Sequence, residues 1–174
     1  TMLKDIEIAR RLGADGVVFG CLTADGEVDL TSMQILMEAS KGLSVTFHRA
    51  FDVCRNPQKA LEEIIELGCN RILTSGQQPT AEQGIGLLKE LQGLAAGRIT
   101  LLAGCGVNEN NIARIAAETG INELHFSARE SIQSEMKFRN EVVSMGGTVH
   151  INEYERNVTS VRRVKETVEA LYKG

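Results

Sequence analysis

The sequence of 174 residues is poor in aromatic side chains, in proline and in long runs of one chemical character. It has no tryptophan and only two tyrosines, so it lacks the aromatic platforms on which single-stranded nucleic acids stack. No Lys/Arg run exceeds a pair and the formal net charge is −4, which disfavours nucleic acid or an anionic membrane surface as a partner. No apolar stretch approaches the roughly 18 residues of a membrane span.

Cysteine is sparse and scattered along the chain. The four cysteines form no CxxC pair, which argues against a zinc site or a disulfide framework. Unpaired cysteines favour a reducing compartment, so we expect a cytoplasmic protein. The hydrophobic share of 43% and the charged share of 24% are typical of a globular chain, and the length suits a single domain over residues 1–174.

Five short apolar segments recur at a nearly constant spacing. They begin near Val17, Val45, Ile72, Thr100 and Glu123, in steps of 28, 27, 28 and 23 residues. This period predicts repeated βα units, and right-handed crossovers then produce a parallel sheet with helices outside it. We therefore predict an α/β fold of the TIM (β/α)8-barrel type, with about five of the eight units present.

Helical periodicity and glycine stop signals fill the spaces between these strands. Thr31, Asn108 and Thr159 are the expected N-caps of the second, fifth and last helices. The passage from Ser127 to Thr159 is expected to be rich in loops. The predicted helices cover 2–12, 31–41, 57–67, 81–94 and 108–119, with a last amphipathic helix after Thr159.

The strand around Val45 and Phe47 ends in ionisable residues. His48, Arg49 and Asp52 follow it at a βα junction, which is where parallel α/β folds carry ligands and chemistry. Asp52 orienting His48 for proton transfer is one interpretation, with His48, Arg49 and Asp52 as candidate catalytic residues. An internal cluster in which Asp52 satisfies His48 is the other.

Small residues end the next strands. Ser75-Gly76 and Gly104-Cys105-Gly106 stand at two consecutive strand ends, and Asn108 opens a helix just beyond them. Glycine lets backbone N–H groups approach an anion closely, so the pattern predicts a phosphate-type site. The anion-binding candidates are Ser75, Gly76, Gly104, Gly106 and Ser127. Tight turns without a ligand are the alternative explanation.

A metal site is a third possibility for the same strand ends. His125 shares a side of the last strand with Ser127, because side chains alternate along a strand. Imidazole and thiolate ligands from His48, Cys105 and His125 suit copper or zinc. Histidines satisfied by ordinary hydrogen bonds remain the alternative.

Five motifs, in order along the chain, resemble the CutC family, the copper homeostasis proteins. They are Thr46-Phe47-His48-Arg49-Ala50-Phe51-Asp52, Leu73-Thr74-Ser75-Gly76, Ala103-Gly104-Cys105-Gly106-Val107, His125-Phe126-Ser127-Ala128-Arg129 and Met136-Lys137-Phe138-Arg139-Asn140. The resemblance implies a cytosolic TIM barrel linked to copper binding, which forms homo-oligomers. It also implies that the barrel mouth is lined by His48, Arg49, Asp52, Ser75, Gly76, Gly104, Gly106, His125 and Ser127.

The family's first three βα units have no counterpart in this sequence, and any copper ligands on those strands cannot be transferred to it. Two functions stay open. One is a copper-binding homeostasis protein without turnover. The other is an enzyme acting on a small anionic or phosphorylated metabolite, with His48 as acid–base catalyst and the glycine-rich corner holding the anion.

Overall fold

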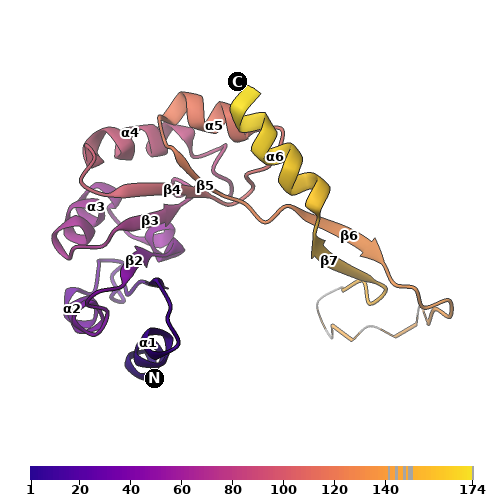
Figure 1. Cartoon of the computed structure of the whole chain (residues 1–174), viewed down its shortest axis with the longest axis horizontal. Coiled ribbons are helices and arrows are strands. Elements are labelled where there is room, and N and C mark those ends of the chain that lie inside the picture. Colours follow the sequence, from indigo (N-terminus) through magenta and orange to yellow (C-terminus); the bar gives the residue numbers. More distant parts are fainter. Residues whose placement is uncertain (141, 144, 147, 149–150, 174) are drawn as a thin grey trace.

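The computed structural model describes residues 1–140, 142–143, 145–146, 148 and 151–173, and its main feature is a five-stranded parallel sheet (Figure 1). The strands lie side by side in chain order, so each βα unit adds its strand next to the previous one. This confirms the α/β fold and the five strand positions. The strands are β1 (Gly16–Phe19), β2 (Ser44–Phe47), β3 (Arg71–Thr74), β4 (Thr100–Gly104) and β5 (Glu123–His125).

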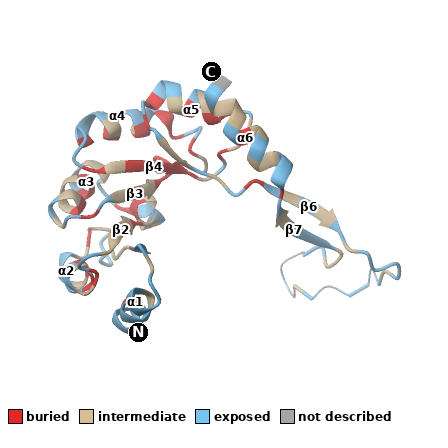
Figure 2. Ribbon diagram, in the orientation of Figure 1, coloured by how far each residue is buried: buried red, intermediate tan, exposed pale blue. Residues whose placement is uncertain are grey.

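Helices cover the outer side of the curved sheet. Figure 2 shows the buried residues concentrated between the helices and this side of the sheet. Side chains such as Met33, Leu61, Leu88 and Ile115 are fully buried there, and they supply the apolar area that stabilises the fold. The helices are α1 (Met2–Arg11), α2 (Leu30–Ala39), the 3-10 helix η1 (Arg49–Val53), α3 (Pro57–Glu66), α4 (Ile85–Ala95), α5 (Ile112–Thr119) and α6 (Val161–Lys173).

The inner side of the sheet is more polar and more accessible. Along β2 the buried residues Val45 and Phe47 face the helices, and the alternating positions face inward. On the inner side Arg71 and Glu123 form an ion pair at 2.6 Å, with both side chains 36% exposed. In the described part of the chain, β1 pairs only with β2 and β5 only with β4, so both edges of the sheet have a single neighbour.

The passage after Ser127 is rich in loops among its described residues, and it also holds two strands that the sequence did not predict. Strands β6 (Arg129–Gln133) and β7 (Glu155–Thr159) form an antiparallel pair that extends away from the sheet (Figure 1). Most of their side chains are exposed, so the two segments lack the apolar alternation by which a half-buried strand is recognised. After β7 the chain returns, and α6 packs against α5.

Several helices begin at other residues than predicted, and local hydrogen bonds explain the difference. Asp29, rather than Thr31, caps α2, with its carboxylate accepting the Ser32 N–H at 3.0 Å. The side chain of Asn108 accepts the Asn110 N–H in a turn that precedes α5. None of the helices in the described residues is long and apolar enough to cross a membrane.

Candidate functional site

Asp52 lies at the centre of a hydrogen-bond network where β2 and β3 end. Its carboxylate is 7% exposed and accepts the Thr74 hydroxyl at 2.6 Å and the backbone N–H of Ser75 at 3.0 Å. It also accepts the backbone N–H of Gln77 at 3.3 Å and the Nε–H of Arg49 at 2.6 Å. Both carboxylate oxygens are occupied, and these contacts, the Asp52 network, connect η1 to the end of β3.

Arg49 belongs to the Asp52 network and also lies near Cys105 at the end of β4. While its Nε–H donates to Asp52, its Nη2 donates to Ser75 Oγ at 3.0 Å. The hydrogen bond to Asp52 raises the pKa of Arg49, burial opposes this, and the Cys105 side chain adds a smaller increase. The guanidinium is therefore a permanent positive charge within reach of both the carboxylate and the sulfur.

The side chain of His48 bonds to the backbone of η1 and not to Asp52. Its Nδ1 accepts the backbone N–H of Ala50 at 3.2 Å and so caps η1. The described contacts of Asp52 do not include His48, so the pairing of these two side chains is not observed. A metal on Nε2 would put the imidazole proton on Nδ1 and break the bond to Ala50.

A pocket of about 530 Å³ opens at the carboxyl ends of β3, β4 and β5. Three arginines and no acidic residue line it, and carboxylates beside the pocket pair with two of these arginines. We call this cavity the strand-end pocket. Its polar lining residues are Arg49, Cys105, Gly106, Asn108, His125, Ser127, Arg129 and Arg163.

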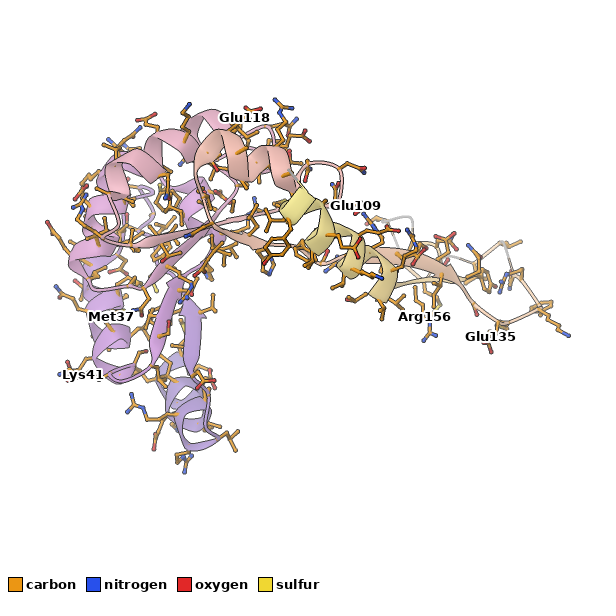
Figure 3. The ribbon with its side chains drawn as sticks, turned by 45° about the horizontal axis from the view of Figure 1, so that its top comes forward. Met37, Lys41, Glu109, Glu118, Glu135 and Arg156 are labelled. Carbon is orange, nitrogen blue, oxygen red and sulfur yellow. The ribbon has the colours of Figure 1, made fainter. Side chains whose placement is uncertain are left out.

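The three arginines differ in how far they are already paired. Arg49 contacts Asp52 as described, and Arg163 binds both oxygens of Glu109, through Nε at 3.2 Å and Nη2 at 3.1 Å. The hydrogen bond to Arg163 is the main cause of a lowered pKa of Glu109, which Figure 3 labels beside α6. The side chain of Arg129 has no hydrogen bond or ion pair to the described residues, so its charge is available to a ligand.

Cys105 lies at the tip of β4 in a left-handed backbone conformation, with φ +82°. Its Sγ lies 3.1 Å from the carbonyl oxygen of Pro79, to which the thiol donates. The preceding Gly104 is buried and has no space for a side chain, since a Cβ there would lie 2.6 Å from Leu73 Cδ1 and 3.3 Å from the Cβ of His125. Gly104 therefore allows His125 to pack closely over the end of β4.

The structure separates the predicted anion-binding residues into two groups. Gly106 and Ser127 line the strand-end pocket. Ser75 is buried within the Asp52 network, and the backbone of Gly76 is packed so closely that a Cβ would lie 2.5 Å from the Gly84 carbonyl oxygen. Gly76 and Gly104 thus have close-packing roles.

The predicted metal ligands come together only in part. Cys105 and His125 both line the strand-end pocket, whereas His48 does not. Within the described residues no group of three or more His, Cys, Asp or Glu side chains is placed to hold a metal ion. The structure therefore brings two of the three predicted copper ligands into one cavity.

Arg129 and Arg163 are the two charged residues of the pocket lining that were not among the predicted site residues. Arg129 directly follows the His125 motif, which is a signal for its position. Arg163 is on α6, beyond the β6–β7 hairpin, and only the tertiary structure brings it to the pocket.

A second hollow of about 550 Å³ lies at the opposite ends of the strands, near Met37 and Lys41 (Figure 3). Parallel α/β folds carry their chemistry at the carboxyl ends of strands, so we assign the site to the strand-end pocket.

Comparison with known proteins gives consistent matches. A protein of Bacteroides thetaiotaomicron described as family protein CutC is 77% identical over 171 residues, covering 98% of this chain and 69% of the relative. The crystal structure of the putative copper homeostasis protein CutC from Streptococcus agalactiae is 34% identical with a TM-score of 0.67. That match covers 71% of this chain and 60% of the Streptococcus chain.

A more distant solved structure, described as native KDPGal, has a TM-score of 0.57 at 14% identity and covers 98% of this chain and 65% of that one. At this identity it supports the fold alone. The CutC family model matches residues 1–130, which hold the whole parallel sheet and most of the strand-end pocket. Together with the identity to the Bacteroides protein, this match shows that the chain belongs to the CutC family.

Proposed function

We propose that this chain has the copper homeostasis role that the name of the Streptococcus agalactiae protein states, and that it binds its ligand in the strand-end pocket. Family membership and the shared fold support the role. The chain spans 69% of the Bacteroides relative and 60% of the Streptococcus structure, so the activity of the whole protein is transferred here only as a proposal. Four free cysteines agree with a cytoplasmic location.

Copper itself would use Cys105 and His125 as protein ligands in this pocket, because thiolate and imidazole suit Cu(I) and Cu(II). His48 is the third proposed ligand, at the cost of its bond to Ala50. Copper titration of the reduced protein, followed by metal analysis, tests this. We expect Cys105→Ser and His125→Ala to lower the bound copper and His48→Ala to have a smaller effect. Unchanged binding in all three variants would exclude these ligands.

A specific observation favours a second function, the binding of a small anionic or phosphorylated metabolite. Three arginines line the strand-end pocket, no carboxylate does, and Arg129 is unpaired within the described chain. Charge-assisted and bidentate contacts from arginine suit carboxylates and phosphates. If turnover follows binding, His48 is the proposed acid–base catalyst, and the Asp52 network holds Arg49 in place.

Inorganic phosphate is the probe for this anion site. Titration to millimolar phosphate should raise the melting temperature of the wild-type chain, because a ligand that binds the folded state stabilises it. Arg129→Gln should reduce the shift. Arg156→Gln is the matched control, because Arg156 is exposed on the β6–β7 hairpin (Figure 3). A wild-type protein that does not respond to phosphate would refute the anion site.

We also infer that the sheet is part of an eight-stranded barrel, and that a homo-oligomer or further strands cover its edges. The single neighbours of β1 and β5 and the 62% exposure of Val18 support this, because exposed sheet edges are usually paired or covered. Light scattering of the purified chain tests the oligomer. A monodisperse monomer at high concentration would argue against self-association.

A further inference from the structure

One of the five motifs noted in the sequence, Met136-Lys137-Phe138-Arg139-Asn140, lies outside the strand-end pocket. It follows β6, near the end of the β6–β7 hairpin that is farther from the parallel sheet (Figure 1). Figure 3 labels the preceding residue, Glu135, at this end of the hairpin. Residues 135–138 are all exposed, and we call them the 135–138 loop.

Tyr154 holds the 135–138 loop at both ends. The Ser134 N–H donates to the Tyr154 carbonyl at 2.7 Å, and the Asn140 N–H donates to the Tyr154 hydroxyl at 2.6 Å. The Arg139 guanidinium lies 4.3 Å from the centre of the Tyr154 ring and donates to the Ser134 carbonyl at 3.0 Å. The ends of the loop are therefore fixed before any partner arrives, which lowers the entropic cost of binding one.

The side chains of the loop alternate between charged and apolar. Met136 is 53% exposed and Phe138 is 69% exposed, and they alternate with Glu135 and Lys137. Neither of these two charged side chains has a hydrogen bond or ion pair to the described residues. Aromatic and methionine side chains are enriched at the centres of protein interfaces, with polar side chains around them. The 135–138 loop therefore has the composition of a small protein interface.

We propose that the 135–138 loop binds the same loop of a second copy of this chain across a twofold axis at Met136. The order of the charges favours a second copy as the partner. Glu135 and Lys137 lie on either side of Met136, so the axis places Glu135 beside Lys137 of the partner subunit and repeats the contact in reverse. The opposite charges fix the register, and Met136 and Phe138 supply the apolar contact.

This contact is separate from the covering of the sheet edges proposed above. Strands β6 and β7 carry the loop away from the parallel sheet, which leaves room for two loops to meet (Figure 1). The edges of β1 and β5 stay open in such a dimer. The loop is much smaller than a standard interface of about 800 Å² per partner, so we expect a weak dimer that depends on protein concentration.

Sedimentation equilibrium of the full chain over a range of concentrations measures this dimer. Phe138→Ser should raise the dissociation constant at least 10-fold, because the largest apolar contact is lost. Leu12→Ser is the matched control, since Leu12 is also an exposed apolar residue but lies at the end of α1. It should change the dissociation constant less than 2-fold. Both positions are exposed, so equal melting temperatures of the two variants confirm that each is folded.

Charge reversal tests the register. Glu135→Lys and Lys137→Glu should each raise the dissociation constant at least 5-fold, because like charges then meet across the twofold axis. An equimolar mixture of the two variants should form a heterodimer at least 5-fold more tightly than either variant dimerises alone. The double variant should return to within 3-fold of wild type. High salt should reduce all these differences.

Three results would overturn the proposal. The first is a chain that stays monomeric at millimolar concentration, and the second is weakening by both charge variants without recovery in their mixture. The third is a dimer that Phe138→Ser leaves unchanged. Val18→Ser separates this contact from the sheet edges: a dimer that depends on Val18 and not on Phe138 would refute the loop contact and support association through β1.

Discussion

The Asp52 network and the strand-end pocket lie at the same edge of the sheet and use similar side chains, but they differ in how far those side chains are satisfied. In the network, both oxygens of Asp52 accept hydrogen bonds, and Ser75 is fully buried. In the pocket, the charge of Arg129 is unpaired within the described residues, and the Cys105 thiol is accessible. Arg49 belongs to both regions.

This difference in hydrogen bonding separates polar residues that stabilise the fold from polar residues that are free to bind a ligand. A buried carboxylate with every oxygen occupied stabilises the local structure and has no capacity left for substrate. A cation without a partner contributes little to folding and is free to bind an anion. Variants in the first region should therefore change stability, and variants in the second should change ligand response.

The largest effect is expected for Asp52→Ala. Removing the carboxylate leaves the Thr74 hydroxyl and the Ser75 N–H without their acceptor and removes the partner of Arg49. We expect the free energy of unfolding to fall by roughly 2–4 kcal/mol, discounted for the partial exposure of Arg49. Urea unfolding at pH 7 measures it. A loss below about 1 kcal/mol would mean that the network does not hold the fold.

Cys69 extends the comparison to the opposite ends of the strands. Burial raises the pKa of Cys69 to about 11, whereas the pKa of an unfolded thiol is about 8.5. The folded state favours the neutral thiol, so this contribution is present below about pH 8.5 and is lost as the pH rises through about 11.

The measurement compares wild type with Cys69→Ala by urea unfolding between about pH 8 and 11.5. The difference in their free energies of unfolding should shrink by roughly 2–3 kcal/mol across this window. Parallel curves would show that the buried thiol titrates as it does in the unfolded chain.

Gly106→Ala should have an intermediate effect and tests how the pocket is built. Gly106 has φ +75°, and a Cβ would lie 3.0 Å from Thr80 Cγ2. Gly13→Ala is the matched control, with φ +83° and no atom within 4 Å of its Cβ. Both should lose about 1 kcal/mol for the left-handed backbone, and Gly106→Ala more because of the contact. Equal losses in the free energy of unfolding would mean that the Thr80 side chain moves away from the new Cβ without cost.

The smallest change in stability is expected for Arg129→Gln. Its side chain has no partner among the described residues, so the free energy of unfolding should stay within about 0.5 kcal/mol of wild type. The phosphate-induced rise in melting temperature should nevertheless fall. Destabilisation comparable to that of Asp52→Ala would remove the distinction between the two regions.

Periodicity predicted the parallel sheet well, because its strands are short apolar segments between regular helices. Each predicted strand start lies within one residue of an observed strand, from Val17 in β1 to Glu123 in β5. The β6–β7 pair was not predicted because its exposed residues carry no apolar alternation and its partners are far apart in the sequence.

The site was predictable in its location but not in its contacts. Chain order places His48, Cys105 and His125 at or just after strand ends, but it cannot say which neighbour each side chain contacts. Asp52 bonds to residues of the next strand end instead of His48, and Arg163 reaches the pocket only through the docking of α6. Both results depend on tertiary packing, which local sequence does not encode.

The β6–β7 hairpin has a consequence for engineering. The Ser160 N–H donates to the Ala128 carbonyl at 3.0 Å, so the chain leaves the parallel sheet and returns to it at one point. Strands β6 and β7 lie between these two points and form a sheet of their own, so they interrupt no strand of the parallel sheet. We expect a short turn or a fluorescent reporter domain to be accepted in place of these two strands, because their ends meet. With Arg129 and Arg163 retained, such a fusion would place its signal beside the pocket and convert ligand binding into an optical readout.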